Sequence, residues 1–152
     1  MLSALGAPYG RRPIDVYSRG TSAIVAAMRE RARGRRLVVV SSGLTYAPPR
    51  GNLAADLLLF PLLRHVVGRT LYRDMRAMEE ELRDAPDIAW TIMRPGRLID
   101  AEAVSAYRLD RDHPSQGWTT RPDLAAAMVA QLESQDDVHA AVAPTTDRRA
   151  RR

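Results

Sequence analysis

The pattern of apolar and polar positions divides the chain into segments that alternate between strand-like and helix-like. Residues 1–6 form an apolar run, and residues 16–28 then place Ile24, Val25 and Met28 on one helical face. Residues 36–43 follow with a short buried-type run, LVVV, that ends in two serines and a glycine. A strand, a helix and a second strand in this order predict a β-α-β unit with parallel strands.

The pattern continues through the rest of the chain. It predicts strands at residues 88–93, 105–109 and 138–143, and helices at residues 53–67, at residues 70–84 and after Thr120. The 70–84 helix is the clearest, because its apolar residues recur at helical spacing and Glu79 stands four residues before Arg83. Thr120 is the expected N-cap of the last helix, with Asp123 three residues later. The 53–67 segment is expected to pack on the sheet rather than form a substrate lid.

These elements fit one α/β domain at residues 1–143, followed by a basic, disordered tail at residues 144–152. A chain of 152 residues with 45% apolar content can bury a single core. Its longest apolar run, residues 57–63, is far short of the roughly 18 residues that span a membrane. Residues 1–6 also lack the basic leader of a signal peptide. We therefore expect a soluble, cytoplasmic protein that does not contact a membrane.

Charge and composition narrow the chemistry. The formal net charge is +5 and all 23 basic residues are arginine, but acidic residues are interleaved with them, as in Arg73-Asp74 and residues 79–83. We interpret most of these charges as solvated helix faces, so nucleic-acid binding is disfavoured. The chain has no cysteine, and its three histidines are isolated, so no metal site is predicted. Asp112, His113 and Ser115 are the residue types of a catalytic triad, but they stand close together in the sequence, so we predict that they are part of a loop.

The absence of lysine excludes three kinds of site. These are a Schiff base, the lysine of a P-loop, and the Tyr-x-x-x-Lys pair of typical short-chain dehydrogenases. The nearest surviving pattern is Tyr72 followed by Arg76, and a planar guanidinium is a crude replacement for an ammonium group.

Three stretches of the sequence carry a resemblance to a known family. They are MLSALGAP with VYSRGTSAIVAAM, then RRLVVVSSG, and then WTIMRPGRL. In this order they resemble the atypical short-chain dehydrogenase/reductases, in particular the NAD(P)H-binding flavin reductase/biliverdin reductase B-like group. The resemblance extends over residues 2–143. It implies a partial, Rossmann-type, doubly wound parallel sheet that binds NADP or NAD, with NADP favoured.

One motif that the resemblance leads us to expect is missing from this sequence. A dinucleotide fold needs a Gly-rich turn, such as G-x-G-x-x-G, between a strand and a helix to hold the pyrophosphate. None of the nine glycines provides that spacing. We therefore expect the chain to represent the carboxyl-terminal portion of the fold, either because its start is assigned too late or because it is a gene remnant. Exposure of a sheet edge would then favour self-association.

Candidate site residues follow from the strand ends and from the resemblance. Ser41 and Ser42 end a buried strand, and open α/β sheets bind ligands at that end. The resemblance implies a catalytic role for Ser42 and contacts to the cofactor from Leu5, Gly6, Ser41, Ser42, Pro95, Gly96 and Arg97. Tyr72 is a second candidate catalytic residue, as a proton donor, although its place beside an apolar helical stripe favours a boundary position. Tyr46 is a further candidate for the pocket wall.

Two functional classes remain open on these residues. The leading hypothesis is an NAD(P)H-dependent oxidoreductase domain that reduces a flavin, a quinone or another small acceptor, impaired by truncation. Some relatives carry histidine where this chain has Gly96, which disfavours a biliverdin-like substrate. The alternative is a non-catalytic NAD(P)-responsive sensor of the NmrA-like type, or an inactive gene remnant.

Overall fold

The computed structural model describes residues 1–8, 10, 12–31, 34–47, 62, 66 and 68–147. Its main sheet has five strands in the order β1-β2-β3-β7-β5. These strands are β1 (Leu2–Ser3), β2 (Arg36–Val40), β3 (Ala89–Met93), β5 (Tyr107–Arg111) and β7 (Ala140–Thr146). The neighbours from β1 to β7 pair in parallel, and β5 closes the sheet antiparallel to β7. A separate parallel pair joins β4 (Arg97–Ile99) to β6 (Trp118–Thr120).

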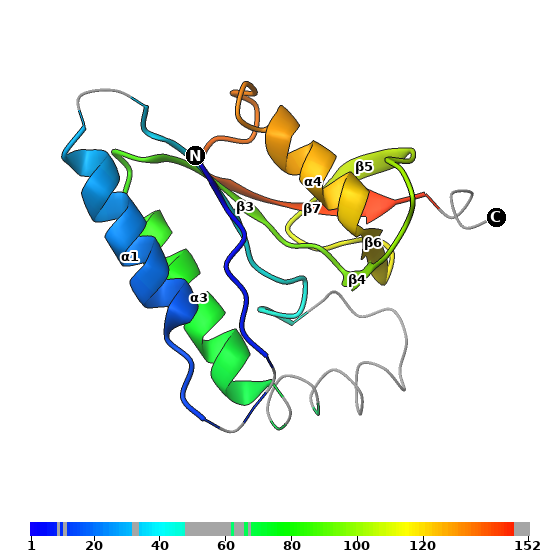
Figure 1. The fold of residues 1–152 in the computed structure, drawn as a ribbon, viewed down its shortest axis with the longest axis horizontal. Helices are drawn as coiled ribbons and strands as arrows, with labels where there is room; N and C mark the ends of the chain where they lie inside the picture. Colours follow the sequence, from blue (N-terminus) through cyan, green and yellow to red (C-terminus); the bar gives the residue numbers. More distant parts are fainter. Residues whose placement is uncertain are drawn as a thin grey trace.

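Helices cover both faces of this sheet. Helices α1 (Val16–Arg29) and α3 (Arg69–Arg83) pack side by side on one face, and α4 (Arg121–Ala130) packs on the other (Figure 1). Strand β2 contributes side chains to both hydrophobic cores, because successive side chains of a strand point to opposite faces of the sheet. Leu37 and Val39 join the cluster beneath α1 and α3, while Val38 joins the cluster beneath α4. The chain therefore has the mixed α/β, mostly parallel architecture that the pattern predicted.

The opening β-α-β unit and the long helix are confirmed. Leu2 pairs in parallel with Val38, and α3 begins and ends one residue before the predicted bounds of 70–84. Strand β1 is shorter than the predicted residues 1–6, because the chain leaves the sheet to pack against α1. Leu5 lies against that helix, and the Ala7 N–H donates to Tyr17 Oη at 3.2 Å.

The carboxyl-terminal part differs more from the prediction. Residues 144–146 were assigned to a disordered tail, which is wrong, because β7 extends to Thr146 and its last residues pair with β5. Proline is tolerated there because the ladder does not use its missing N–H, and the Pro144 carbonyl accepts the Thr119 hydroxyl at 2.5 Å. Strand β5 lies two residues later than the predicted 105–109, and β4 and β6, of three residues each, were not predicted.

Two of the predicted segments lie largely outside the residues that the structure describes. The predicted helix at 53–67 and the basic cluster at 148–152 lie outside the described residues, apart from residues 62 and 66. At the last helix the expected cap is present, since the Thr120 hydroxyl accepts the Asp123 N–H at 3.2 Å. Among the described helices, none has the length and apolar character to cross a membrane.

Candidate functional site

The ends of β2 and β3 are joined beyond the strands themselves. The Ser41 N–H donates to the Met93 carbonyl at 2.7 Å, and the Gly43 N–H donates to the Pro95 carbonyl at 2.9 Å. The two strands run in parallel, so their carboxyl ends lie at one edge of the sheet. This continued ladder brings two of the predicted site residues, Ser42 and Pro95, to the same place.

A third loop closes against these two strand ends. A Cβ placed on Gly43 would lie 2.8 Å from Pro114 Cδ, and one placed on Gly96 would lie 2.8 Å from the Gly117 carbonyl carbon. Both glycines are therefore needed for packing by residues 112–117, which link β5 to β6. Gly96 was predicted as a cofactor contact, and its packing against Gly117 is a second reason for a glycine at this position. The loop itself was not identified as part of the site.

The link between β5 and β6 is anchored by a carboxylate. Asp110 accepts the Ser115 N–H at 2.8 Å, the Ser115 hydroxyl at 2.6 Å and the Thr145 hydroxyl at 2.6 Å. Burial alone would raise the pKa of Asp110, but these hydrogen bonds outweigh it and lower the pKa to about 2. The loop is thus fixed by an anion that stays ionised at neutral pH.

The two serines at the end of β2 have different surroundings. Ser41 is buried, and its hydroxyl donates to Glu79 Oε1 at 2.6 Å and lies 3.0 Å from Thr45 Oγ1. Ser42 is half-buried, and its Oγ accepts the Leu44 N–H at 3.2 Å. Among the described residues, none accepts a hydrogen bond from the Ser42 hydroxyl. Ser41 therefore has a structural role in the fold, and Ser42 keeps a proton to donate.

The residues predicted at the end of β1 also divide into two roles. The Leu5 side chain packs on α1, where its Cδ1 lies 2.5 Å from a Cβ placed on Gly20. A Cβ placed on Gly6 would meet no atom of the described residues within 4 Å, so this part of the fold does not require glycine there. The backbone at Gly6 is left open on the side that a side chain would fill. Arg97, which begins β4, is exposed, and its N–H donates to the Gly117 carbonyl at 2.9 Å.

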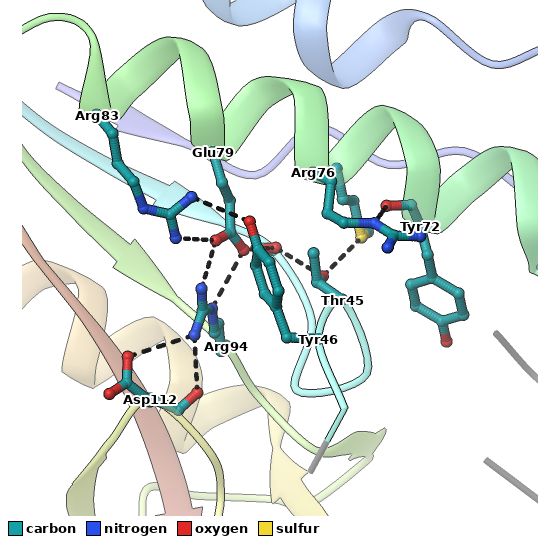
Figure 2. A network of polar contacts seen from close by, with 10 residues as sticks. Thr45, Tyr46, Tyr72, Arg76, Glu79, Arg83, Arg94 and Asp112 are labelled. Carbon is teal, nitrogen blue, oxygen red and sulfur yellow. Dashed lines mark hydrogen bonds and ion pairs between the residues drawn. The ribbon is translucent and has the colours of Figure 1, made fainter. Parts of the chain in front are cut away.

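The hydrogen bond from Arg76 to Tyr72 is made to the tyrosine backbone and not to its hydroxyl. Arg76 Nε lies 3.4 Å from the Tyr72 backbone carbonyl, one helical turn earlier, and not at the phenol (Figure 2). Tyr72 is 1% exposed and belongs to the core beneath α1 and α3. It was expected at the boundary of the core and lies inside it.

A buried ion pair beside the strand ends was missed by the sequence analysis. Glu79 is fully buried, and its two carboxylate oxygens receive Arg94 Nη2 at 2.5 Å and Arg94 Nε at 3.2 Å (Figure 2). Arg83 adds a bond to Glu79 at 2.9 Å and one to Tyr46 Oη at 3.0 Å. Burial lowers the pKa of Arg83, but its contacts with Tyr46 and Glu79 outweigh this and raise the pKa overall. The Tyr46 ring lies under Arg94, with 4.7 Å between its centroid and Cζ.

The first turn of α1 is occupied by a carboxylate from α3. Asp74 accepts the Tyr17 N–H at 2.9 Å and the Ser18 N–H at 3.4 Å, and the Ser18 hydroxyl also donates to it. Asp74 is 5% exposed and Glu79 is 0% exposed, so the interpretation of both as solvated charges is wrong. A helix N-terminus that already binds a carboxylate does not offer its amides to a phosphate.

The sequence matches a family of known proteins. A family model described as NAD(P)H-binding matches residues 2–135. A UPF0659 protein of Schizosaccharomyces pombe is 29% identical over 110 residues, which is 70% of this chain and 43% of that protein. The chain thus spans less than half the length of this curated relative.

Solved structures with the same fold come from several bacteria. A short-chain dehydrogenase/reductase of Veillonella parvula has a TM-score of 0.71 at 17% identity, over 98% of this chain and 64% of that one. A second Veillonella parvula short-chain dehydrogenase/reductase, solved with NADP, has a TM-score of 0.67 at 18% identity, over 88% and 59%. A Streptococcus pneumoniae protein described as an NADH-flavin reductase scores 0.69 at 20% identity, over 96% and 70%. These likenesses show a Rossmann-type fold. Among the described residues, no group of three or more metal-binding side chains is present.

Proposed function

The chain belongs to the NAD(P)H-binding family, and from this membership we propose that the carboxyl ends of β1, β2 and β3 form the nicotinamide side of a reductase site. The observation that carries the proposal is the hydrogen bond from the Gly43 N–H to the Pro95 carbonyl, 2.9 Å, which sets Ser42 beside Pro95. Ligands of open α/β sheets bind outside the carboxyl ends of the strands. The proposed site residues are Ser42, Pro95 and the open backbone at Gly6.

The residues present suit one end of the dinucleotide better than the other. The space beside Gly6 suits the close approach of a flat ring, and Ser42 has a hydroxyl proton to offer. The α1 N-terminus, in contrast, already binds Asp74, so the pyrophosphate must be held by other groups. When bound, the cofactor supplies a hydride. The work of this chain is to orient the ring and the acceptor and to donate a hydrogen bond.

Ser42 is the proposed catalytic residue at this site. Its hydroxyl hydrogen can be donated to the acceptor while its oxygen is held by the Leu44 N–H, which fixes the direction of donation. We propose a flavin or quinone as the acceptor class, in line with the Streptococcus pneumoniae neighbour, and NADP as the preferred cofactor, in line with the Veillonella parvula complex. A cytoplasmic location stays a prediction.

The test compares two serine variants in NADPH binding and in NADPH oxidation with flavin and quinone acceptors, at millimolar NADPH because Asp74 occupies the α1 N-terminus and weak binding is expected. Ser42→Ala is expected to lower turnover about tenfold or more and to change NADPH affinity less than about threefold, because the hydroxyl acts on the reacting groups. The matched control is Ser22→Ala, since Ser22 lies on α1 and its exposed hydroxyl donates to Glu81 at 2.6 Å. Full activity in both variants would contradict the role of Ser42.

A second candidate function is a sensor that binds NAD(P)H without turnover. It is favoured by the absence of lysine, which excludes the Tyr-x-x-x-Lys pair from the sequence. The two functions differ in one measurement. A sensor binds NADPH and shows no oxidation with any acceptor, and its affinity is the same with and without flavin.

A further inference from the structure

We infer that Arg94 is a positioning residue that holds three loops together at the strand ends and so sets the geometry around Ser42 and Pro95. The inference rests on the proposed function, because it concerns the same site. It assigns a role to a residue that follows β3 directly and whose side-chain hydrogen bonds, among the described residues, are made to Glu79 and Asp112. Its guanidinium contacts Glu79 on α3, Asp112 after β5 and Tyr46 in the segment that follows β2.

Every nitrogen of the Arg94 guanidinium is used. Nε and Nη2 bind the two oxygens of Glu79 on α3, at 3.2 and 2.5 Å. Nη1 donates to the Asp112 carbonyl at 3.3 Å and lies 3.4 Å from its carboxylate. The flat face of the group covers the Tyr46 ring. Because the Arg94 side chain is only 5% exposed, these contacts are little screened by water.

Glu79 connects the Arg94 guanidinium to the end of β2. It receives the Ser41 hydroxyl at 2.6 Å as well as the two guanidinium groups, so both of its oxygens are bonded. Ser41 precedes Ser42, and Tyr46 follows it four residues later. The segment that carries Ser42 is therefore held at both of its ends by the Arg94 and Glu79 pair. A fully bonded buried pair of this kind favours one arrangement of its partners.

The bond to Asp112 fixes the third segment. Asp112 has a φ of 60°, which places a non-glycine residue in the left-handed region. A residue stays in this conformation when its surroundings impose it, and here Arg94 binds its carbonyl while its own N–H donates to Ala141 at 3.1 Å. Pro114, two residues later, packs on Gly43. Loss of the Arg94 contact should therefore loosen the loop that packs on Gly43, next to Ser42 in the chain.

Arg36 provides a matched control at the opposite end of the same strands. It begins β2, and its guanidinium binds the Ala89 carbonyl at 2.8 Å, Thr91 Oγ1 at 2.8 Å and Gln131 Oε1 at 3.3 Å. Both arginines thus join several segments of the sheet through side-chain hydrogen bonds. They differ in position, since Arg36 lies at the amino ends and Arg94 at the carboxyl ends, and in their partners, since Arg94 binds the Glu79 carboxylate and Arg36 binds neutral oxygens.

The test is hydrogen exchange of single backbone amides in the full chain, followed by NMR. The reporter near Arg94 is the Gly43 amide, bonded to Pro95 at 2.9 Å, and the reporter near Arg36 is the Ala89 amide, bonded to Arg35 at 2.8 Å. In Arg94→Met, the exchange of Gly43 should accelerate at least about tenfold more than the exchange of Ala89, because any global loss of stability acts on both amides alike. In Arg36→Met the pattern should reverse. Equal acceleration of both amides in Arg94→Met would mean a global loss of stability and would overturn the inference.

Two further variants keep the test decisive. Glu79→Gln keeps the shape of the side chain and removes its charge, so it should accelerate Gly43 selectively even if Arg94→Met does not fold. Arg94→Lys keeps the charge and loses the planar fork, so it should resemble Arg94→Met. Exchange at the wild-type rate in Arg94→Lys would show that charge alone suffices and would contradict the proposed positioning.

A separate arm distinguishes this inference from the proposed function. Reduced nicotinamide mononucleotide is titrated into the labelled chain, and the shifts of the Ser42 and Gly43 amides are followed. Binding in the wild type that weakens tenfold or more in Arg94→Met, but not in Arg36→Met, supports both proposals. If the wild-type shifts do not respond, the proposed site is wrong, while the exchange rates still decide whether Arg94 holds the loops. If binding is equal in all three proteins, Arg94 does not set the geometry of the site.

Discussion

At the carboxyl ends of β2 and β3, hydrogen bonds and a buried ion pair join three loops, whereas the outer edge of β1 leaves apolar side chains exposed. Met1 is 53% and Leu2 is 38% exposed there, and Met1 lines a groove of about 570 Å³ together with Ile24 of α1. In the described part of the chain, no strand pairs with the outer side of β1. Directional bonds fix positions, and an apolar edge favours association without fixing a partner. The carboxyl ends of β2 and β3 are thus held in a fixed geometry, whereas the outer edge of β1 is open to pairing with another chain.

The largest effect that would break this comparison concerns cofactor affinity. The strand ends offer contacts to a ring but the α1 N-terminus is occupied by Asp74, so the chain lacks phosphate contacts there. Charged hydrogen bonds contribute about 1.5–3 kcal/mol each, so two missing bonds weaken binding roughly a hundredfold or more. We expect little NADPH binding by this chain at micromolar concentrations in calorimetry. Tight binding would mean that the phosphates are held by a feature not recognised here.

The next prediction tests whether the strand ends depend on their buried ion pair. Glu79→Ala leaves the Arg94 guanidinium buried without its carboxylate, which should lower the free energy of unfolding by about 3–5 kcal/mol. Asp15→Ala is the comparison, because Asp15 pairs with Arg19 at 3.0 Å with both side chains largely exposed. That change should cost less than about 1 kcal/mol. Urea denaturation measures both, and equal losses would show that burial of the pair is unimportant.

The β1 edge should make the protein self-associate. Light scattering of the wild-type chain is expected to give a mass above that of a monomer, because the edge and the adjacent groove expose apolar surface. Leu2→Arg places a charge on the edge strand and should lower the apparent mass severalfold. Val104→Arg serves as the control, since Val104 is 55% exposed and lies away from β1 in the sequence and the sheet. A monodisperse monomer that melts cooperatively in the wild type would exclude this reading of the edge.

The smallest expected effect is the acid stability of the loop that covers the strand ends. Asp110 has a pKa near 2 in the folded protein and an ordinary value of 3.8, so its ionised form is favoured by folding. Its contribution is fully present above about pH 3.8 and is lost as the pH falls toward 2. Exchange of the Ser115 amide should therefore accelerate in that window, and Asp110→Asn should remove the dependence. An unchanged pH profile in Asp110→Asn would assign the effect to another group.

The sequence was sufficient where structure follows from neighbouring residues. The apolar stripe of α3, the β-α-β order at the start and the Thr120 cap all depend on spacings of a few residues, and each is confirmed. The end of β2 was likewise recognised from its two serines. Local periodicity carries this information because it reports which face of an element is buried.

The missed features depend on partners that are distant in the sequence. Asp74 and Glu79 look like surface charges of an amphipathic helix, and the i,i+4 spacing to Arg83 supports that interpretation. Their burial depends on Tyr17, 57 residues before Asp74, and on Arg94, 15 residues after Glu79. Arg94 did stand in the recognised motif beside Pro95, and that position was the available signal. The three-residue strands β4 and β6 are too short to show a period.

The contact of Asp74 with the first turn of α1 has a consequence for the order of folding. The amides of Tyr17 and Ser18 gain their carboxylate partner only after α3 has docked. Closing that contact brings together residues 57 positions apart, so it is formed late compared with helix turns, and the start of α1 should fray until then. The two helices consequently mature as one cooperative unit.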